Sequence, residues 1–100
     1  MSTISVVVSH QLEPQEAVRR IQSALAEAQQ SYSDYLAQGE FRWVDQVLSY
    51  RFQTMGLVVA GTLSVGPGQV VVEAELPPTA WMLRGMIERQ IHQRLSELLS

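Results

Sequence analysis

The chain has 100 residues, of which 46% are apolar and 17% charged, and its formal net charge is −3. This length predicts one domain, residues 1–100, with one modest core. The seven basic residues are scattered arginines, whereas nucleic-acid binding needs a dense basic patch, so we expect no nucleic-acid partner. The absence of cysteine excludes disulfides, thiolate nucleophiles and cysteine-ligated zinc.

The N-terminal third predicts a strand followed by a long helix. Ile4, Val6 and Val8 recur at every second position, which indicates a first strand and not a signal peptide. Pro14 suits the first position of a helix, and Gly39 is expected to end it. The helix has one apolar stripe, formed by Val18, Ile21, Leu25, Ala28, Tyr32 and Tyr35.

No apolar stretch approaches the roughly 20 residues that a membrane span needs. We therefore expect a cytoplasmic protein that is not transmembrane.

The middle of the chain predicts four more strands, each with alternating apolar residues. They are centred on Phe41–Trp43, Leu48–Phe52, Leu57–Val65 and Val70–Leu76. Tight turns are expected at Val44–Gln46, Met55–Gly56 and Gly66–Gln69, and the last is the strongest turn signal because it combines two glycines with a proline.

The hydrophobic period changes at residues 76–79, where Pro77 and Pro78 end the last strand. Helical spacing follows from Ala80 to Leu99, and Thr79 is expected to cap this helix. Its predicted core stripe is Leu83, Ile87, Ile91, Leu95 and Leu98. The order β-α-β-β-β-β-α predicts an α+β fold, in which an antiparallel sheet carries both helices on one face.

Residues with catalytic or metal-binding chemistry are few. His10 and His92 lie in no motif, so surface or capping roles are expected for both. Glu73 and Glu75 are spaced as neighbours on one strand face, which predicts a solvated face because hard cations need more than two oxygen ligands. No serine is flanked as a nucleophile elbow, and no glycine-rich loop opens a helix. We expect no catalytic residue, no metal and no cofactor.

Four aromatic residues fall on two adjacent predicted strands: Phe41, Trp43, Tyr50 and Phe52. Cross-strand aromatic pairs commonly stabilise a sheet. The same side chains could line an apolar pocket between sheet and helix. Both interpretations stay open, and the second makes Trp43 and Tyr50 candidate ligand contacts.

The start of the last helix is apolar on more than one face. Leu83 and Ile87 belong to the predicted core stripe, whereas Trp81, Met82 and Met86 lie beside it. Either this segment is buried beneath the rest of the domain, or it contacts a partner chain, a lipid or another apolar phase. Methionine side chains adapt well to such contacts. Trp81, Met82 and Met86 are therefore candidate contact residues.

Three stretches and the N-terminal segment carry a resemblance to a bacterial family: WVDQVLSY at 43–50, GTLSV at 61–65, VVVEAELP at 70–77 and SHQL at 9–12. The chain resembles the polyhydroxyalkanoic acid system proteins, also called polyhydroxyalkanoate granule region proteins. This resemblance implies association with polyester storage granules and implies no catalytic residues. The element order is also similar to a shortened helix-grip fold of the Bet v 1 or START type, which implies a small or filled apolar cavity.

These observations leave three functional hypotheses. The first is a non-enzymatic accessory protein that binds an apolar surface or a small hydrophobic ligand. The second is a structural homo-oligomer that uses the start of the last helix as its interface. The third is a small helix-grip enzyme of hydrophobic molecules, for which Tyr50 and Arg51 are the only polar candidates.

Overall fold

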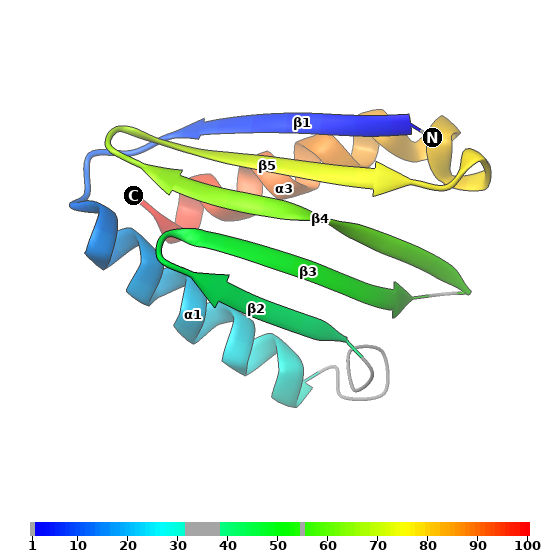
Figure 1. Cartoon of the computed structure of the whole chain (residues 1–100). Coiled ribbons are helices and arrows are strands. Elements are labelled where there is room, and N and C mark those ends of the chain that lie inside the picture. The colour runs from blue at the N-terminus through cyan, green and yellow to red at the C-terminus, as the bar shows by residue number, and fades with distance from the viewer. Residues whose placement is uncertain (1, 32–38, 55) are drawn as a thin grey trace.

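The computed structural model describes residues 2–31, 39–54 and 56–100, and the predicted positions of Tyr32, Tyr35 and Met55 lie outside these ranges (Figure 1). The elements follow the predicted order β-α-β-β-β-β-α, with one 3₁₀ helix, η1, before the last α-helix. They are β1 (Ser2–Ser9), α1 (Pro14–Ser31), β2 (Glu40–Val44), β3 (Val47–Thr54), β4 (Leu57–Gly66), β5 (Gln69–Leu76), η1 (Pro78–Leu83) and α3 (Arg84–Leu98).

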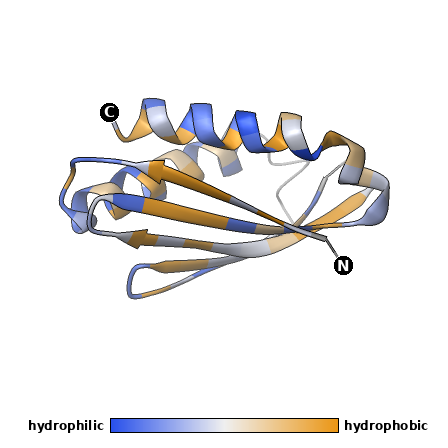
Figure 2. Cartoon of the chain, turned by 90° about the horizontal axis from the view of Figure 1, so that it is seen from above, coloured by the Kyte–Doolittle hydropathy of each residue, from blue (hydrophilic) through white to orange (hydrophobic). Residues whose placement is uncertain are grey.

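The strands form one antiparallel five-stranded sheet with the order β1-β5-β4-β3-β2. Strand β1 reaches the sheet by pairing with β5, so the first and last strands of the chain are neighbours. Both helices lie on the same side of the sheet (Figure 2). The predicted α+β fold, with both helices on one face, is therefore confirmed.

The main core lies between the sheet and the two helices. Alternate strand residues face the helices, which is why the period-two pattern of the sequence becomes a buried face. Helix α1 contributes Ala17 and Ile21, and α3 contributes Leu95. The strand members of this core are Val6, Val8, Leu48, Leu63, Val65, Val70 and Val72.

A second, smaller core lies beside η1. It consists of Ile4, Ala74, Leu76 and Ala80, all of which are buried. The last residue of β5 and the first turn of η1 thus share one cluster, so the Pro77–Pro78 corner is fixed by packing on both sides.

The end of α3 is also held by the core and by α1. Leu99, which the predicted stripe did not include, is only 3% exposed and belongs to the main core. The Arg20 side chain donates hydrogen bonds from Nη1 to the Leu98 carbonyl oxygen at 3.2 Å and to the Ser100 carbonyl oxygen at 3.0 Å. A cation at a helix C-terminus satisfies carbonyl groups that have no partner within the helix.

The start of the last helix differs from the prediction. The α-helix begins at Arg84, and its N-cap is Leu83 without a side-chain hydrogen bond, so the prediction that Thr79 caps it was wrong. Pro77 is extended, with φ −65° and ψ 156°, and the following residues form η1. Because a 3₁₀ helix has about three residues per turn, it rotates Leu83 away from the position that an α-helix would give it. Leu83 is 47% exposed, and its predicted place in the core stripe was also wrong.

His10 connects two corners of the fold, and it is buried instead of lying on the surface. The ring is 7% exposed, Nε2 lies 2.9 Å from the Gly66 carbonyl oxygen, and Nδ1 accepts a hydrogen bond from the Leu12 backbone N–H at 3.1 Å. Since Nδ1 is an acceptor, the proton lies on Nε2, which donates to Gly66. The histidine therefore ties the β1–α1 connection to the β4–β5 turn.

Candidate functional site

One end of the molecule exposes a group of large apolar side chains on η1 and the first turn of α3. Met82 is 91% exposed, Leu83 47% and Met86 48%. Trp81 lies beside them and is half-buried. We call the surface formed by these four residues the collar. Of the two alternatives for this segment, burial beneath the domain does not apply to Met82, Leu83 and Met86, because their side chains are exposed.

Trp81 is the fixed base of the collar. Its ring packs against the second core, to which β5 and η1 contribute residues. The Arg84 guanidinium lies 4.8 Å from the ring centroid, and its Nη1 donates a hydrogen bond to the Trp81 carbonyl oxygen at 3.0 Å. A cation over the face of a tryptophan is attracted by the ring quadrupole. The second core and Arg84 therefore both hold the indole in place, whereas Met82 is exposed to solvent.

Two arginines lie at the rim of the collar. Arg84 and Arg89 are exposed, and the Arg89 guanidinium lies next to Gly85. Each guanidinium carries five N–H donors and no acceptor. The collar thus combines apolar side chains that have no hydrogen-bonding groups with a rim that offers donors.

The other two predicted contact residues are not part of the collar. Trp43 lies on β2, at the opposite edge of the sheet from β1, and packs against the main core. Tyr50 lies on β3 and touches both cores. The Phe52 ring centroid lies 6.2 Å from that of Phe41 and 6.1 Å from that of Tyr50. Phe41, Trp43 and Tyr50 pack against the main core, which agrees with the first of the two interpretations.

Tyr50 is held by a hydrogen bond that crosses β4. Its hydroxyl donates to the Glu73 carbonyl oxygen of β5 at 2.7 Å. The residue between them on β4 is Gly61, which is the register partner of Tyr50 on one side and of Ala74 on the other. Only a residue without a side chain leaves room for the phenol to pass over β4. Burial, together with the Glu73 carboxylate, raises the pKa of Tyr50 from 10.0 to about 12.

This shift predicts late ionisation of one tyrosine. The folded protein favours the neutral phenol, so the contribution of Tyr50 to stability is fully present below pH 10 and is lost as the pH rises through about 12. In a spectrophotometric titration, the difference between the wild type and Tyr50→Phe should be a step near pH 12. A difference step near pH 10 would contradict the hydrogen-bonded, buried position of Tyr50.

One hollow lies between α1 and α3 above the sheet, where a helix-grip fold would have its cavity. It is an open groove of about 550 Å³. Its lining is aliphatic, with Arg94 and Glu97 at the edge, and consists otherwise of Ile21, Ala24, Leu25, Leu48, Leu63, Leu95 and Leu98. Neither Trp43 nor Tyr50 lines this groove.

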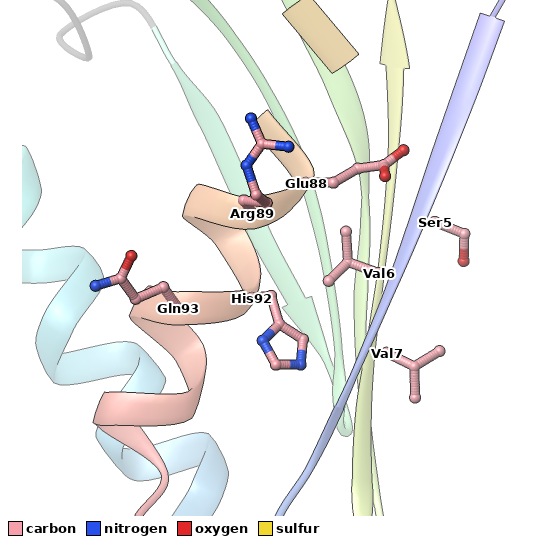
Figure 3. Close-up of a pocket in the computed structure, with 7 residues that line it drawn as sticks. All are labelled: Ser5, Val6, Val7, Glu88, Arg89, His92 and Gln93. Carbon is pink, nitrogen blue, oxygen red and sulfur yellow. The ribbon is translucent and has the colours of Figure 1, made fainter. Parts of the chain in front are cut away.

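A second hollow, of about 370 Å³, lies between β1 and α3. Glu88 and His92 extend from α3 toward β1, whereas Arg89 and Gln93 extend away from it (Figure 3). His92 is exposed, as expected, and Ser96 Oγ lies 3.4 Å from its Nδ1. Within the described residues no three side chains of the metal-binding types come together. This hollow is therefore lined by polar side chains of α3 and by Ser5, Val6 and Val7 of β1.

Sequence reasoning missed two features of this end of the molecule. Leu83 belongs to the collar and not to the core, and Arg84 stacks on Trp81. The Pro77–Pro78 pair was the available signal, since it disfavours an immediate α-helix and favours a tighter first turn. Which of the apolar side chains in this segment are exposed depended on that turn.

A known protein family matches nearly the whole length of the chain. Residues 4–99 match the model of a protein family described as "Putative polyhydroxyalkanoic acid system protein". The match runs from β1 to the end of α3 and includes both the collar and the main core. No curated protein and no solved structure matches the chain. In the part of the chain that the structure describes, no helix is long and apolar enough to cross a membrane.

Proposed function

The chain belongs to the polyhydroxyalkanoic acid system protein family, and from this premise we propose that it is a non-enzymatic accessory protein of bacterial polyhydroxyalkanoate metabolism, which binds the apolar surface of the polyester in the cytoplasm. The collar is the contact surface. The observation that carries the proposal is the exposure of Met82, Leu83 and Met86 side by side on one end of the fold.

The chemistry of the collar fits a polyester. Such a polymer presents methyl and methylene groups together with ester oxygens, which are hydrogen-bond acceptors, and it has no donors along its length. A matching protein surface needs apolar side chains and donors. The collar supplies the first, and the guanidinium groups of Arg84 and Arg89 supply the second.

The flexibility of the side chains in the collar also fits the surface of a polyester. An amorphous polymer has no fixed shape, so the side chains that meet it must adapt, and methionine has three rotatable bonds and a polarizable sulfur. Trp81, at the base of the collar, must already be ordered before binding, because the entropy lost on ordering it would weaken the binding. Trp81 and the Pro77–Pro78 corner are held by the second core and by Arg84, so only the outer side chains need to rearrange.

The test is co-sedimentation with dispersed poly(3-hydroxybutyrate). Met82→Gln together with Met86→Gln is expected to weaken binding at least about tenfold, because burying one such apolar side chain contributes roughly 1.5–3 kcal/mol. The matched control is Ala26→Gln, since Ala26 is exposed on α1, away from both the collar and the face of the sheet turned away from the helices.

Retention of the control on the polyester and release of the double variant is the expected pattern. Equal binding by both variants, or no binding by the wild type, would reject the collar as the contact surface. Light scattering on the same samples decides the second hypothesis, that the collar joins two copies. A change in mass in the double variant, without polyester present, would favour it.

A further inference from the structure

No helix of the described residues covers the sheet face turned away from α1 and α3 (Figure 2). We call it the open face. All the large apolar residues that are exposed in the described part of the chain lie either in the collar or on this face. Those of the open face are Val7, Val44, Val47 and Val58, which are 39–56% exposed.

The strand register arranges the open face in rows that cross the sheet. One row is apolar except at its centre, and it runs from β1 to β2 as Val7, Val71, Ser64, Val47 and Val44. The next row is Ser5, Glu73, Thr62, Ser49 and Arg42, and the third is Thr3, Glu75, Ala60, Arg51 and Glu40. Along β4, at the centre of each row, the residues are small: Ser64, Thr62 and Ala60.

The open face carries three acids and two arginines, and the third acid, Glu40, lies on β2 as the register partner of Arg51. Glu73 and Glu75 lie on β5, on one side of β4, and both arginines, Arg42 and Arg51, lie on β2 and β3, on the other. Both ion pairs found within the described residues are on α1, so among those residues neither Glu75 nor Arg51 has an ion-pair partner. In the third row, Glu75 and Arg51 thus lie at equal distances from β4, on opposite sides of it.

We propose that the open face is the interface with a second copy of this chain, related by a two-fold axis that runs along β4 between the two sheets. Such an axis places β5 of one copy over β3 of the other at the same row. Glu75 then faces Arg51 of the second copy, Val71 faces Val47 of the second copy, and Thr62 faces its own counterpart. Every charged and apolar group of these pairs meets a complementary one.

The alternative in-plane axis, perpendicular to the strands, fails this test. It would exchange the first and third rows, so Val71 would meet Glu75 of the second copy and Val47 would meet Arg51. That arrangement buries charges against valines, which is unfavourable without a partner charge. Aligned packing of two antiparallel sheets, about 30° apart, is the common geometry of β-sandwiches, and a two-fold axis about 15° from the direction of β4 produces it.

The area of the open face suffices for a weak but specific dimer. With strands about 4.8 Å apart and rows about 7 Å apart, five strands and three rows cover roughly 500 Å² per copy. The pair therefore buries about 1,000 Å², which is the lower limit of a specific interface. The small residues along β4 allow the two sheets to approach closely at the axis.

The experiment exchanges the facing charges. Arg51→Glu and Glu75→Arg each place two like-charge contacts in the homodimer, and each is expected to raise the dimer dissociation constant at least about tenfold in sedimentation equilibrium. A mixture of the two variants restores both contacts, because each Glu then meets an Arg. The mixture should therefore form heterodimers with near wild-type affinity, and the double variant Arg51→Glu/Glu75→Arg should recover its homodimer.

Glu27→Arg on α1, an exposed position away from the open face, is the control for a change of net charge. A wild type that stays monomeric at high concentration would overturn the proposal. So would single variants that dimerise like the wild type, or a mixture without heterodimers. A dimer that is lost only in Met82→Gln/Met86→Gln would assign the contact to the collar and overturn the proposal equally, whereas polyester binding by a monomer leaves the proposed function standing.

Discussion

Gly61→Ala is expected to destabilise the fold by about 3 kcal/mol, because it forces a methyl group into a position that has no room for it. A Cβ at Gly61 would overlap the Glu73 carbonyl group and lie 2.7 Å from the Tyr50 hydroxyl oxygen. The substitution therefore separates β4 from β5, or displaces Tyr50 and breaks its hydrogen bond, or both. A domain of this length has roughly 5–15 kcal/mol of total stability, so the loss should be large in urea denaturation.

Gly66→Ala is the matched control, since it makes the same change on the same strand. A Cβ at Gly66 has its nearest contact, the Gln69 carbonyl oxygen, at 3.6 Å, which is an ordinary van der Waals distance. This variant should unfold within about 0.5 kcal/mol of the wild type. Equal losses at both glycines would show that the close passage of Tyr50 over β4 does not exist.

Leu76→Ala is expected to cost about 3 kcal/mol of unfolding free energy, because it leaves a cavity in the second core. Leu76 is 2% exposed and is the largest fully buried side chain among the described residues. Ala80 and Trp81 pack in the same cluster. The variant should therefore also loosen the base of the collar and weaken binding to polyester at temperatures where it is still folded.

Leu83→Ala removes the same atoms from a position that is 47% exposed. It should change the unfolding free energy by no more than about 0.5 kcal/mol. The two leucines are close in the sequence, and their predicted difference depends only on the η1 turn. Similar costs for both substitutions would place Leu83 in the core, as the sequence pattern suggested, and would contradict the structure.

The strands were predictable because their signal is local. Val70, Val72, Ala74 and Leu76 alternate with Val71, Glu73 and Glu75, and the first set becomes the buried face of β5 as expected. The glycine-rich turn at 66–69 likewise gives the β4–β5 hairpin. In both cases the physical cause, the two-residue period of a strand and the turn preference of glycine, lies within a few positions.

The start of the last helix was not predictable to the same degree. A 3₁₀ turn and an α-turn differ by a fraction of a residue per turn, and the choice at Pro78–Leu83 depends on how Ala80 fits the second core. That fit involves Ile4, which lies more than seventy positions earlier in the chain. The collar was therefore identified by composition, and the exposure of Leu83 followed only from the structure.

The rows of the open face needed the full register of the sheet. Val7 and Val44 lie on opposite edge strands, and nothing between them in the sequence says that they share a row. The pairing of Glu75 with Arg51 across a second copy is similarly invisible in the sequence. Both placements follow from the register of β4 with β3 and with β5, and therefore from the pairing of segments that are distant in the sequence.

The two proposed surfaces are compatible in one assembly. The collar lies beyond the end of β5 and the open face lies on the side of the sheet, so they share no residue. A two-fold axis along β4 keeps both collars at the same end of the dimer. Two collars on one side would bind a polyester surface bivalently, which raises the apparent affinity without any new contact.

The fluorescence of Trp81 tests the central claim, that the collar binds polyester, most directly. In a Trp43→Phe variant, Trp81 is the sole tryptophan. We predict that dispersed poly(3-hydroxybutyrate) shifts its emission to shorter wavelength, and that Met82→Gln/Met86→Gln in the same background abolishes the shift. An unchanged Trp81 spectrum at polyester concentrations that sediment the protein would contradict the collar as the binding surface.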